Sequence, residues 1–168
     1  MKLTIPILIL LIFLCSGCQN KPDNRSSSKV PSESELIDLN KSLITKDRGV
    51  ITEYLGKSRQ SFSETNTGLW YSILSEGNGE KVKTGDNVTF DYECTLLDGS
   101  PCYSGSQTIR VGYAGAESGV TEGLQLMNRG SDYMFIIPPY LAYGHTGDGG
   151  RIPGRAILVY RIRIMDIN

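Results

Sequence analysis

Apolar and polar positions follow two different periods along this 168-residue chain, and the change of period divides it into two parts. Through residues 34–55 apolar side chains recur at near-helical intervals, and Ser32 with Glu35 has the spacing of a capping box. This pattern predicts one or two amphipathic helices, with a break near Gly49. Their apolar stripe must be buried either on the chain's own second part or against a second copy of the chain.

From Leu69 onward the period changes to the alternation that is typical of strands. The alternating segments, separated by turn residues, are 69–74, 87–96, 108–111, 133–137 and 156–167. One helix-sized apolar pattern lies among them at 119–127 and is closed by Gly130. Several strands around one short helix indicate an α+β domain, which we expect to cover 68–168.

The beginning of the chain is typical of a signal peptide. Lys2 precedes an apolar run over 3–14, which is too short for a membrane-spanning helix of about 20 apolar residues. Two small residues then stand directly before Cys18, as in the lipobox of bacterial lipoproteins, in which the cysteine is acylated and becomes the mature N-terminus. We predict that 1–17 is removed and that Cys18 carries a lipid. The alternative is a secreted protein cut elsewhere, with Cys18 a free thiol.

The composition after Cys18 predicts how the chain is held at a membrane. Residues 18–33 are polar and should form a tether, and 34–67 comprises the helical extension and a second linker. Gln19 stands where an Asp would favour retention at the inner membrane. We therefore expect a protein of the cell envelope, lipid-anchored in the outer membrane and facing the periplasm, a compartment that permits disulfides.

Charge and histidine content argue against several classes of ligand. Seventeen Lys and Arg against 18 Asp and Glu leave no basic excess for nucleic acid. His145, the only histidine, lacks the Cys and His neighbours that a zinc site needs. The glycine-rich stretch 147–150 lacks the following Lys-Ser/Thr of a phosphate-binding loop. We expect neither a metal nor a cofactor.

A series of short motifs runs in order through the second half of the chain. They are Thr84-Gly85-Asp86, Leu97-Asp98-Gly99, Glu122-Gly123-Leu124, Ala142-Tyr143-Gly144 and Ile152-Pro153. In this order and spacing they resemble the FKBP-type peptidyl-prolyl isomerases. The resemblance implies a half-barrel, in which a twisted antiparallel sheet wraps one short helix and the pocket lies between them. The helical extension on a lipoprotein is similar to the subgroup associated with bacterial gliding motility.

The resemblance also implies which residues form the site. Tyr92, Tyr143 and the backbone N–H of Glu117 would act on the substrate. The residues that would contact its proline segment are Val120, Ile152, Tyr160, Cys102, Tyr103 and Ala116. Rotation about an X-Pro bond has a barrier of about 18–20 kcal/mol from lost amide resonance, so an apolar cup with one or two hydroxyls is required and no nucleophile. For any single tyrosine, or for Val120, core packing is the alternative interpretation.

Several positions depart from the family's pattern. The replacements are Val120 for an aromatic floor residue, Cys102 for a Phe, Tyr103 for an acid, Gln107 for an aromatic residue, and Asp148 and Arg151 for a His and an Ile. Because an aromatic side chain can bury about 150–250 Å², their loss should loosen the cup. We expect activity that is weaker or differently selective than in a typical member.

Cys94 and Cys102 flank the Asp98-Gly99 turn at separations that could place them nearly opposite each other in a hairpin. Two alternatives stay open. One is a disulfide that stiffens the pocket wall, and the other is a pair of reduced, buried thiols that behave as small apolar residues.

Two main functional hypotheses follow, beside a third in which the apolar helix holds unfolded chains, as a chaperone does, without reference to proline. The first is a peptidyl-prolyl isomerase of the cell envelope that acts on proline-containing polypeptides. The second is a weakly active or inactive FKBP-like lipoprotein that holds a partner in an envelope assembly, through its cup or its helix. The apolar helix also allows self-association through 34–55.

Overall fold

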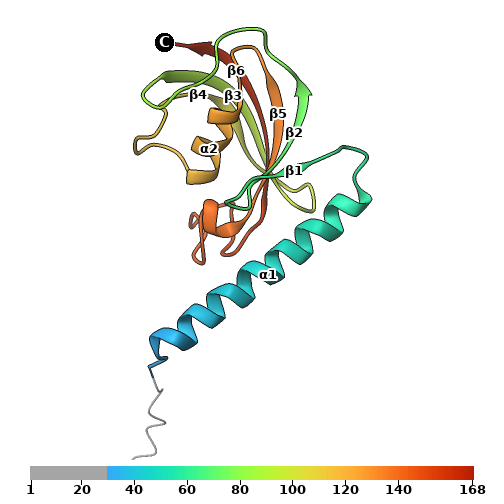
Figure 1. Cartoon of the computed structure of the whole chain (residues 1–168), viewed down its shortest axis with the longest axis vertical. Helices are drawn as coiled ribbons and strands as arrows, with labels where there is room; N and C mark the ends of the chain where they lie inside the picture. Colours follow the sequence, from blue (N-terminus) through green and yellow to red (C-terminus); the bar gives the residue numbers. More distant parts are fainter. Residues whose placement is uncertain (1–29) are drawn as a thin grey trace, which may run out of the picture.

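The computed structural model describes residues 30–168 (Figure 1). The predicted signal peptide, Cys18 and nearly all of the predicted tether therefore lie outside the described residues. In chain order the elements are α1 (Glu33–Lys57), β1 (Ser63–Glu64), β2 (Trp70–Ser75), β3 (Asn87–Leu96), β4 (Pro101–Arg110), α2 (Ser118–Leu126), β5 (Asp132–Ile137), the short 3-10 helix η1 (Pro139–Leu141) and β6 (Leu158–Ile167). Within 30–168 no helix is both long and apolar enough to cross a membrane.

The extension forms one continuous helix, α1, of 25 residues. Its capping box is present as predicted, because the Ser32 side chain accepts from the Glu35 backbone N–H and the Ser32 backbone N–H donates to the Glu35 carboxylate at 2.7 Å. The predicted break at Gly49 is wrong. A helix tolerates an isolated glycine at a cost of about 1 kcal/mol, and in the described chain no atom beyond the helix crowds this position.

Helix α1 crosses one end of the sheet, and its N-terminal turns project beyond the body (Figure 1). The side chains that it buries are Asp47 and Ile51, and Asp47 accepts a hydrogen bond from Arg155 at 2.7 Å. Leu36 and Leu39, in the projecting part, are 45% and 52% exposed. The body therefore covers the middle of the apolar stripe and leaves its beginning open.

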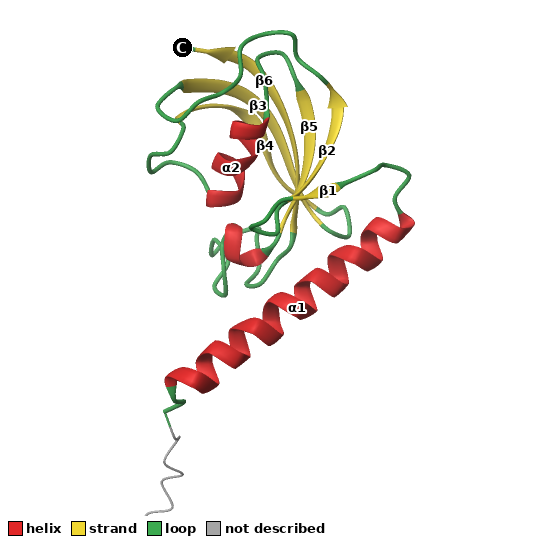
Figure 2. Cartoon of the chain, in the orientation of Figure 1, coloured by secondary structure: helices red, strands yellow, loops and turns green. Residues whose placement is uncertain are grey.

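The six strands form one antiparallel sheet in the order β1-β2-β5-β6-β3-β4. The sheet curves, and α2 lies against its inner face (Figure 2). Fully buried side chains from both layers fill the space between them, among them Phe90, Leu124, Phe135, Leu158 and Ile162. The predicted α+β half-barrel on one short helix, with a helical extension, is confirmed.

Strand β4 is longer than the sequence pattern indicates. The alternation predicted a strand over 108–111, whereas β4 spans Pro101–Arg110 and pairs with β3 along nearly its whole length. Most of its side chains are exposed because β4 is an edge strand of the sheet. A strand whose side chains are mostly exposed needs no alternation of apolar and polar residues. The sequence of 101–107 therefore gave no pattern from which a strand could be predicted.

Two glycines allow α2 to lie close to the sheet. A Cβ atom on Gly123 would stand 2.9 Å from the Phe135 ring, and one on Gly119 would stand 2.5 Å from Cγ2 of Ile137. Neither distance is possible for a real side chain without a shift. The small residues therefore determine how deeply α2 sits in the half-barrel, and with it the position of Val120, which is 2% exposed.

Replacing Gly123 and Gly49 by alanine should change stability in opposite directions. Gly123→Ala forces its methyl group into the Phe135 ring and should lower the free energy of unfolding by about 1–3 kcal/mol. Gly49→Ala adds a good helix former in open space and should raise it by about 0.5–1 kcal/mol. Urea unfolding followed by the fluorescence of Trp70, the single tryptophan, measures both. Equal stability of the two variants would contradict the close packing of α2.

Candidate active site

A cavity of about 300 Å³ opens between the N-terminus of α2 and the inner face of the sheet. It is lined by Phe90, Tyr92, Tyr103, Gln107, Gly115, Glu117, Val120, Tyr143, Asp148 and Tyr160. Six of the predicted site residues, namely Tyr92, Tyr103, Glu117, Val120, Tyr143 and Tyr160, thus share one cavity. The cavity is called the cup below.

The wall of the cup is aromatic and comes from neighbouring strands. Tyr92 of β3 and Tyr160 of β6 stack with their ring centroids 6.0 Å apart, and Phe90 packs against Tyr92 with centroids 6.2 Å apart. Phe90 was missed in the sequence analysis, although it lies two residues before Tyr92 and therefore on the same face of the strand. The period of the strand would have identified it.

The tyrosine hydroxyls at the base of the cup are strongly held in their protonated form. Burial raises the pKa of Tyr143, and the neighbouring Glu117 carboxylate raises it further. Burial also raises the pKa of Tyr160, with the Glu117 carboxylate again adding to the effect. Both hydroxyls consequently keep a proton that can be donated to a ligand at any physiological pH.

Glu117 lines the cup from the N-cap position of α2. Its side chain makes no capping hydrogen bond to the helix. Among the described residues, no acceptor takes up its backbone N–H. The helix dipole places partial positive charge at this end of α2, which favours a ligand oxygen at that N–H.

The rim of the cup is a loop whose turn is organised by one carboxylate. Asp148 accepts hydrogen bonds from the Tyr103 hydroxyl at 2.6 Å, from the backbone N–H of Gly150 at 2.8 Å and from that of Ile152 at 2.9 Å. The Tyr103 hydroxyl bond, followed by the two backbone bonds, lowers the pKa of Asp148. Arg151 Nη1 donates to the Cys102 carbonyl at 2.9 Å and lies over the Tyr103 ring at 5.5 Å.

These contacts join several of the positions that depart from the family's pattern. Tyr103 has replaced an acid on the sheet side, and Asp148 supplies an acid on the loop side, so the two changes meet in one hydrogen bond. Gln107, in place of an aromatic residue, reaches the Gly115 carbonyl with its amide at 3.4 Å. The opening is therefore bounded by polar contacts, and the one made by Gln107 stands where the family's pattern has an aromatic residue.

Three of the predicted substrate contacts lie behind the wall or beside it. Ile152 is 2% exposed and Cys102 is 1% exposed, so both pack in the core beneath the lining. Ala116 is half-buried and packs on the same core. Their roles in substrate binding stay predictions.

Cys94 and Cys102 are both buried and both free thiols in the structure. Burial raises the pKa of the Cys94 thiol to about 12, with the nearby Cys102 also contributing. At neutral pH Cys94 is therefore a thiol and a poor nucleophile. A disulfide between the two stays a prediction.

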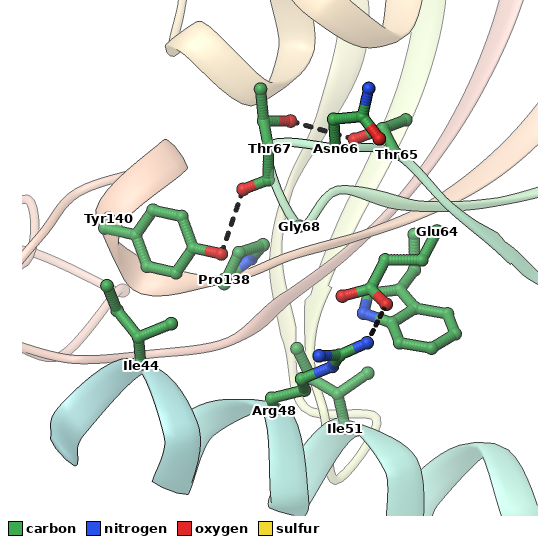
Figure 3. A pocket seen from close by; sticks show the side chains of 11 residues that line it. Ile44, Arg48, Ile51, Glu64, Thr65, Asn66, Thr67, Gly68, Pro138 and Tyr140 are labelled. Carbon is green, nitrogen blue, oxygen red and sulfur yellow. Dashed lines mark hydrogen bonds and ion pairs between the residues drawn. The ribbon is translucent and has the colours of Figure 1, made fainter. Parts of the chain in front are cut away.

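A larger cavity of about 490 Å³ lies elsewhere, between α1 and the body (Figure 3). Ile44, Arg48 and Ile51 of α1 face Glu64, Pro138 and Tyr140 across it (Figure 3). Arg48 pairs with Glu64, and the Tyr140 hydroxyl donates to the Thr67 carbonyl at 3.0 Å. The Arg48–Glu64 pair connects α1 to the body, and the Tyr140 bond holds two segments of the body together beside the cavity.

The fold is thus a curved antiparallel sheet over one helix, with a tyrosine-walled cup at the N-terminus of that helix. The family model of the FKBP-type peptidyl-prolyl cis-trans isomerases matches residues 78–165. The chain belongs to this family, and the predicted family and enzyme class are confirmed.

Named relatives agree with this assignment. The chain is 29% identical to a probable FKBP-type peptidyl-prolyl cis-trans isomerase of Haemophilus influenzae over 92% of its own length and 70% of the relative's. It is 35% identical to FkpA of Escherichia coli over 61% of its own length, but this covers 39% of FkpA. The crystal structure of Escherichia coli FkpA superposes with a TM-score of 0.64 at 26% identity, covering 82% of this chain and 74% of the other.

Tyr103→Phe tests the rim. Without the hydroxyl that contributes most to the lowering, the pKa of Asp148 should rise toward its ordinary value. A carboxyl whose pKa is lowered by folding stabilises the fold at pH values above its unfolded pKa. This stabilisation is lost as the pH falls through the pKa of the folded state. The rim loop of the variant should therefore loosen at a higher pH than that of the wild type.

An NMR titration of the Asp148 carboxyl carbon measures the change in its pKa. Tyr113→Phe, at an exposed tyrosine outside the cup, is the control. An unchanged Asp148 pKa would contradict the Tyr103 contact.

Proposed function

We propose that this chain is a peptidyl-prolyl isomerase of the cell envelope that catalyses X-Pro rotation in secreted or outer-envelope proteins. The observation that supports it most is the convergence of Tyr92, Tyr143, Tyr160 and Glu117 on one cup. Within residues 30–168 the Glu117 backbone N–H has no acceptor. Uncatalysed isomerisation takes tens to hundreds of seconds, so it would limit the folding of such substrates.

The proposed mechanism is noncovalent. The proline ring lies against Val120 and the rings of Tyr92 and Tyr160, which exclude water from the amide. The Tyr143 hydroxyl and the Glu117 backbone N–H donate to substrate carbonyl oxygens and hold the segment in place. As the amide twists it loses resonance, and contacts that are better made by the twisted form than by the planar form lower the barrier.

Tyr143→Phe should lower kcat/KM about tenfold while the fold stays intact, because it removes one hydroxyl that donates to the substrate. Tyr92→Ala should lower it further by opening the wall. Tyr113→Phe should leave it unchanged. Proline-limited refolding of a reporter protein and cleavage-coupled X-Pro peptide assays measure the rates, with circular dichroism to check folding. A wild-type rate equal to the uncatalysed one for every X would contradict the proposal.

A second candidate function is a weakly active or inactive binding protein of an envelope assembly. The observation that favours it is the open beginning of α1, where Leu36, Ile37 and Leu39 are about half exposed. Such a stripe can pack on a partner or on a second copy of the chain. In that case the Tyr143→Phe variant would retain the cellular phenotype of the wild type. Membership of the gliding-motility subgroup stays part of this proposal.

The lipid anchor belongs to the proposal as well. Cys18→Ser should move the chain from the membrane fraction to the soluble fraction and abolish labelling by a fatty-acid analogue, because the acylated cysteine would be lost. Ser26→Ala, in the predicted tether and outside the lipobox, should leave both unchanged. Membrane association that persists in Cys18→Ser would contradict lipidation at this residue.

A further inference from the structure

The cup contains one charged group that neither the fold nor the proposed mechanism requires. The charged side chains in its lining are Glu117 and Asp148, and the lining residues include no Lys, Arg or His. A purely apolar proline ring needs neither charge. The question is which of the two carboxylates is free to act on a ligand.

Asp148 is already occupied. It accepts three hydrogen bonds, from Tyr103, Gly150 and Ile152, and these organise the rim loop. The guanidinium of Arg151 lies over the ring of Tyr103, which donates one of these three bonds. The Asp148 carboxylate is therefore a structural part of the rim.

Glu117 is in a different situation. Its side chain makes no capping bond, and among residues 30–168 it has no ion-pair partner. It is half-buried, lines the cup and acts electrostatically on both Tyr143 and Tyr160. The dipole of α2 and the Tyr143 hydroxyl partly stabilise this carboxylate, and a cationic ligand would add the ion pair that residues 30–168 do not supply.

The surrounding rings add to this preference for a cation. Tyr92, Tyr143 and Tyr160 line the same cavity, and the faces of tyrosine rings attract ammonium and guanidinium groups. The apolar stem of a Lys or Arg side chain can pass along such rings while its charged end reaches the carboxylate. A carboxylate beside aromatic rings is therefore complementary to a basic side chain.

We propose that Glu117 is a specificity-determining residue that selects prolines flanked by lysine or arginine, an inference that rests on the proposed isomerase function. In the free protein the Glu117 carboxylate lies beside the Tyr143 hydroxyl and competes with a substrate carbonyl for it. A basic residue next to the proline forms an ion pair with the Glu117 carboxylate. The Tyr143 hydroxyl is then available to donate to a substrate carbonyl. An acidic residue at that position is repelled.

The test uses the full chain and peptides that differ only in the residue before or after the proline, namely Lys, Arg, Leu or Glu. In the wild type kcat/KM should be about tenfold higher for Lys and Arg than for Leu, and lower for Glu than for Leu. Added salt should reduce the ratio of Lys to Leu. Glu117→Gln, which keeps the size of the side chain, should bring this ratio close to one.

Glu93→Gln is the matched control, because Glu93 is an exposed carboxylate on the opposite face of β3 and should leave the ratio unchanged. An active wild type without preference for Lys or Arg in either series would overturn this inference and leave the isomerase function standing. A ratio of Lys to Leu rates that is unchanged in Glu117→Gln would also overturn the inference.

If the wild type catalyses no peptide, the proposed function fails and binding decides the inference. The same Lys and Leu peptides are then titrated against the chain, with the NMR signals of the cup tyrosines as the readout. Tighter binding of the Lys peptide that is lost in Glu117→Gln would support the role of Glu117, and equal binding would overturn it.

Discussion

The close contact between α2 and strand β5 determines where the site lies. Gly119 and Gly123 let the helix approach Ile137 and Phe135 to distances that no larger residue permits. Because α2 sits so deep in the half-barrel, its N-terminus meets the tyrosine-lined inner face of β3 and β6 and places Val120 and Glu117 there. The cup is the space left between this helix end and the curved sheet.

Three of the departures from the family's pattern, at Tyr103, Asp148 and Arg151, form a connected set. Both Tyr103 on β4 and Asp148 on the rim loop replace family residues, and the Tyr103 hydroxyl donates a hydrogen bond to the Asp148 carboxylate. Arg151 joins this group, because its guanidinium donates to the Cys102 carbonyl and lies over the Tyr103 ring. The opening of the cup has therefore become polar and hydrogen-bonded, while its wall of Phe90, Tyr92 and Tyr160 stays aromatic.

Helix α1 is attached to the body at the same loop that carries the rim. Asp47 binds Arg155, whose backbone N–H donates to the Gly144 carbonyl next to Tyr143. Arg155 itself has a positive φ of 61°, which few residues other than glycine adopt. The extension and the loop that holds Tyr143 are consequently neighbours, and Asp47 and Ile51 are the residues that α1 buries.

The sequence by itself determined the capped helix of the extension, the alternation of β2, β3 and β6, the single helix α2 and the family. The helices and strands are predicted from apolar spacings of two to four residues, and the family from motifs in a set order. Both kinds of signal can be read from the sequence without a structure. It also named most residues of the cup through resemblance. The full length of β4 was not predictable from its alternation, because an edge strand with exposed side chains has none.

Only the tertiary structure decided how the cup is charged and closed. The contact of Tyr103 with Asp148 joins residues 45 apart, and that of Asp47 with Arg155 joins residues 108 apart. The Glu117 side chain enters the cup because α2 begins at that point over the sheet. Such contacts form only when the half-barrel closes. The local spacing of apolar residues along the sequence therefore does not reveal which distant residues will meet.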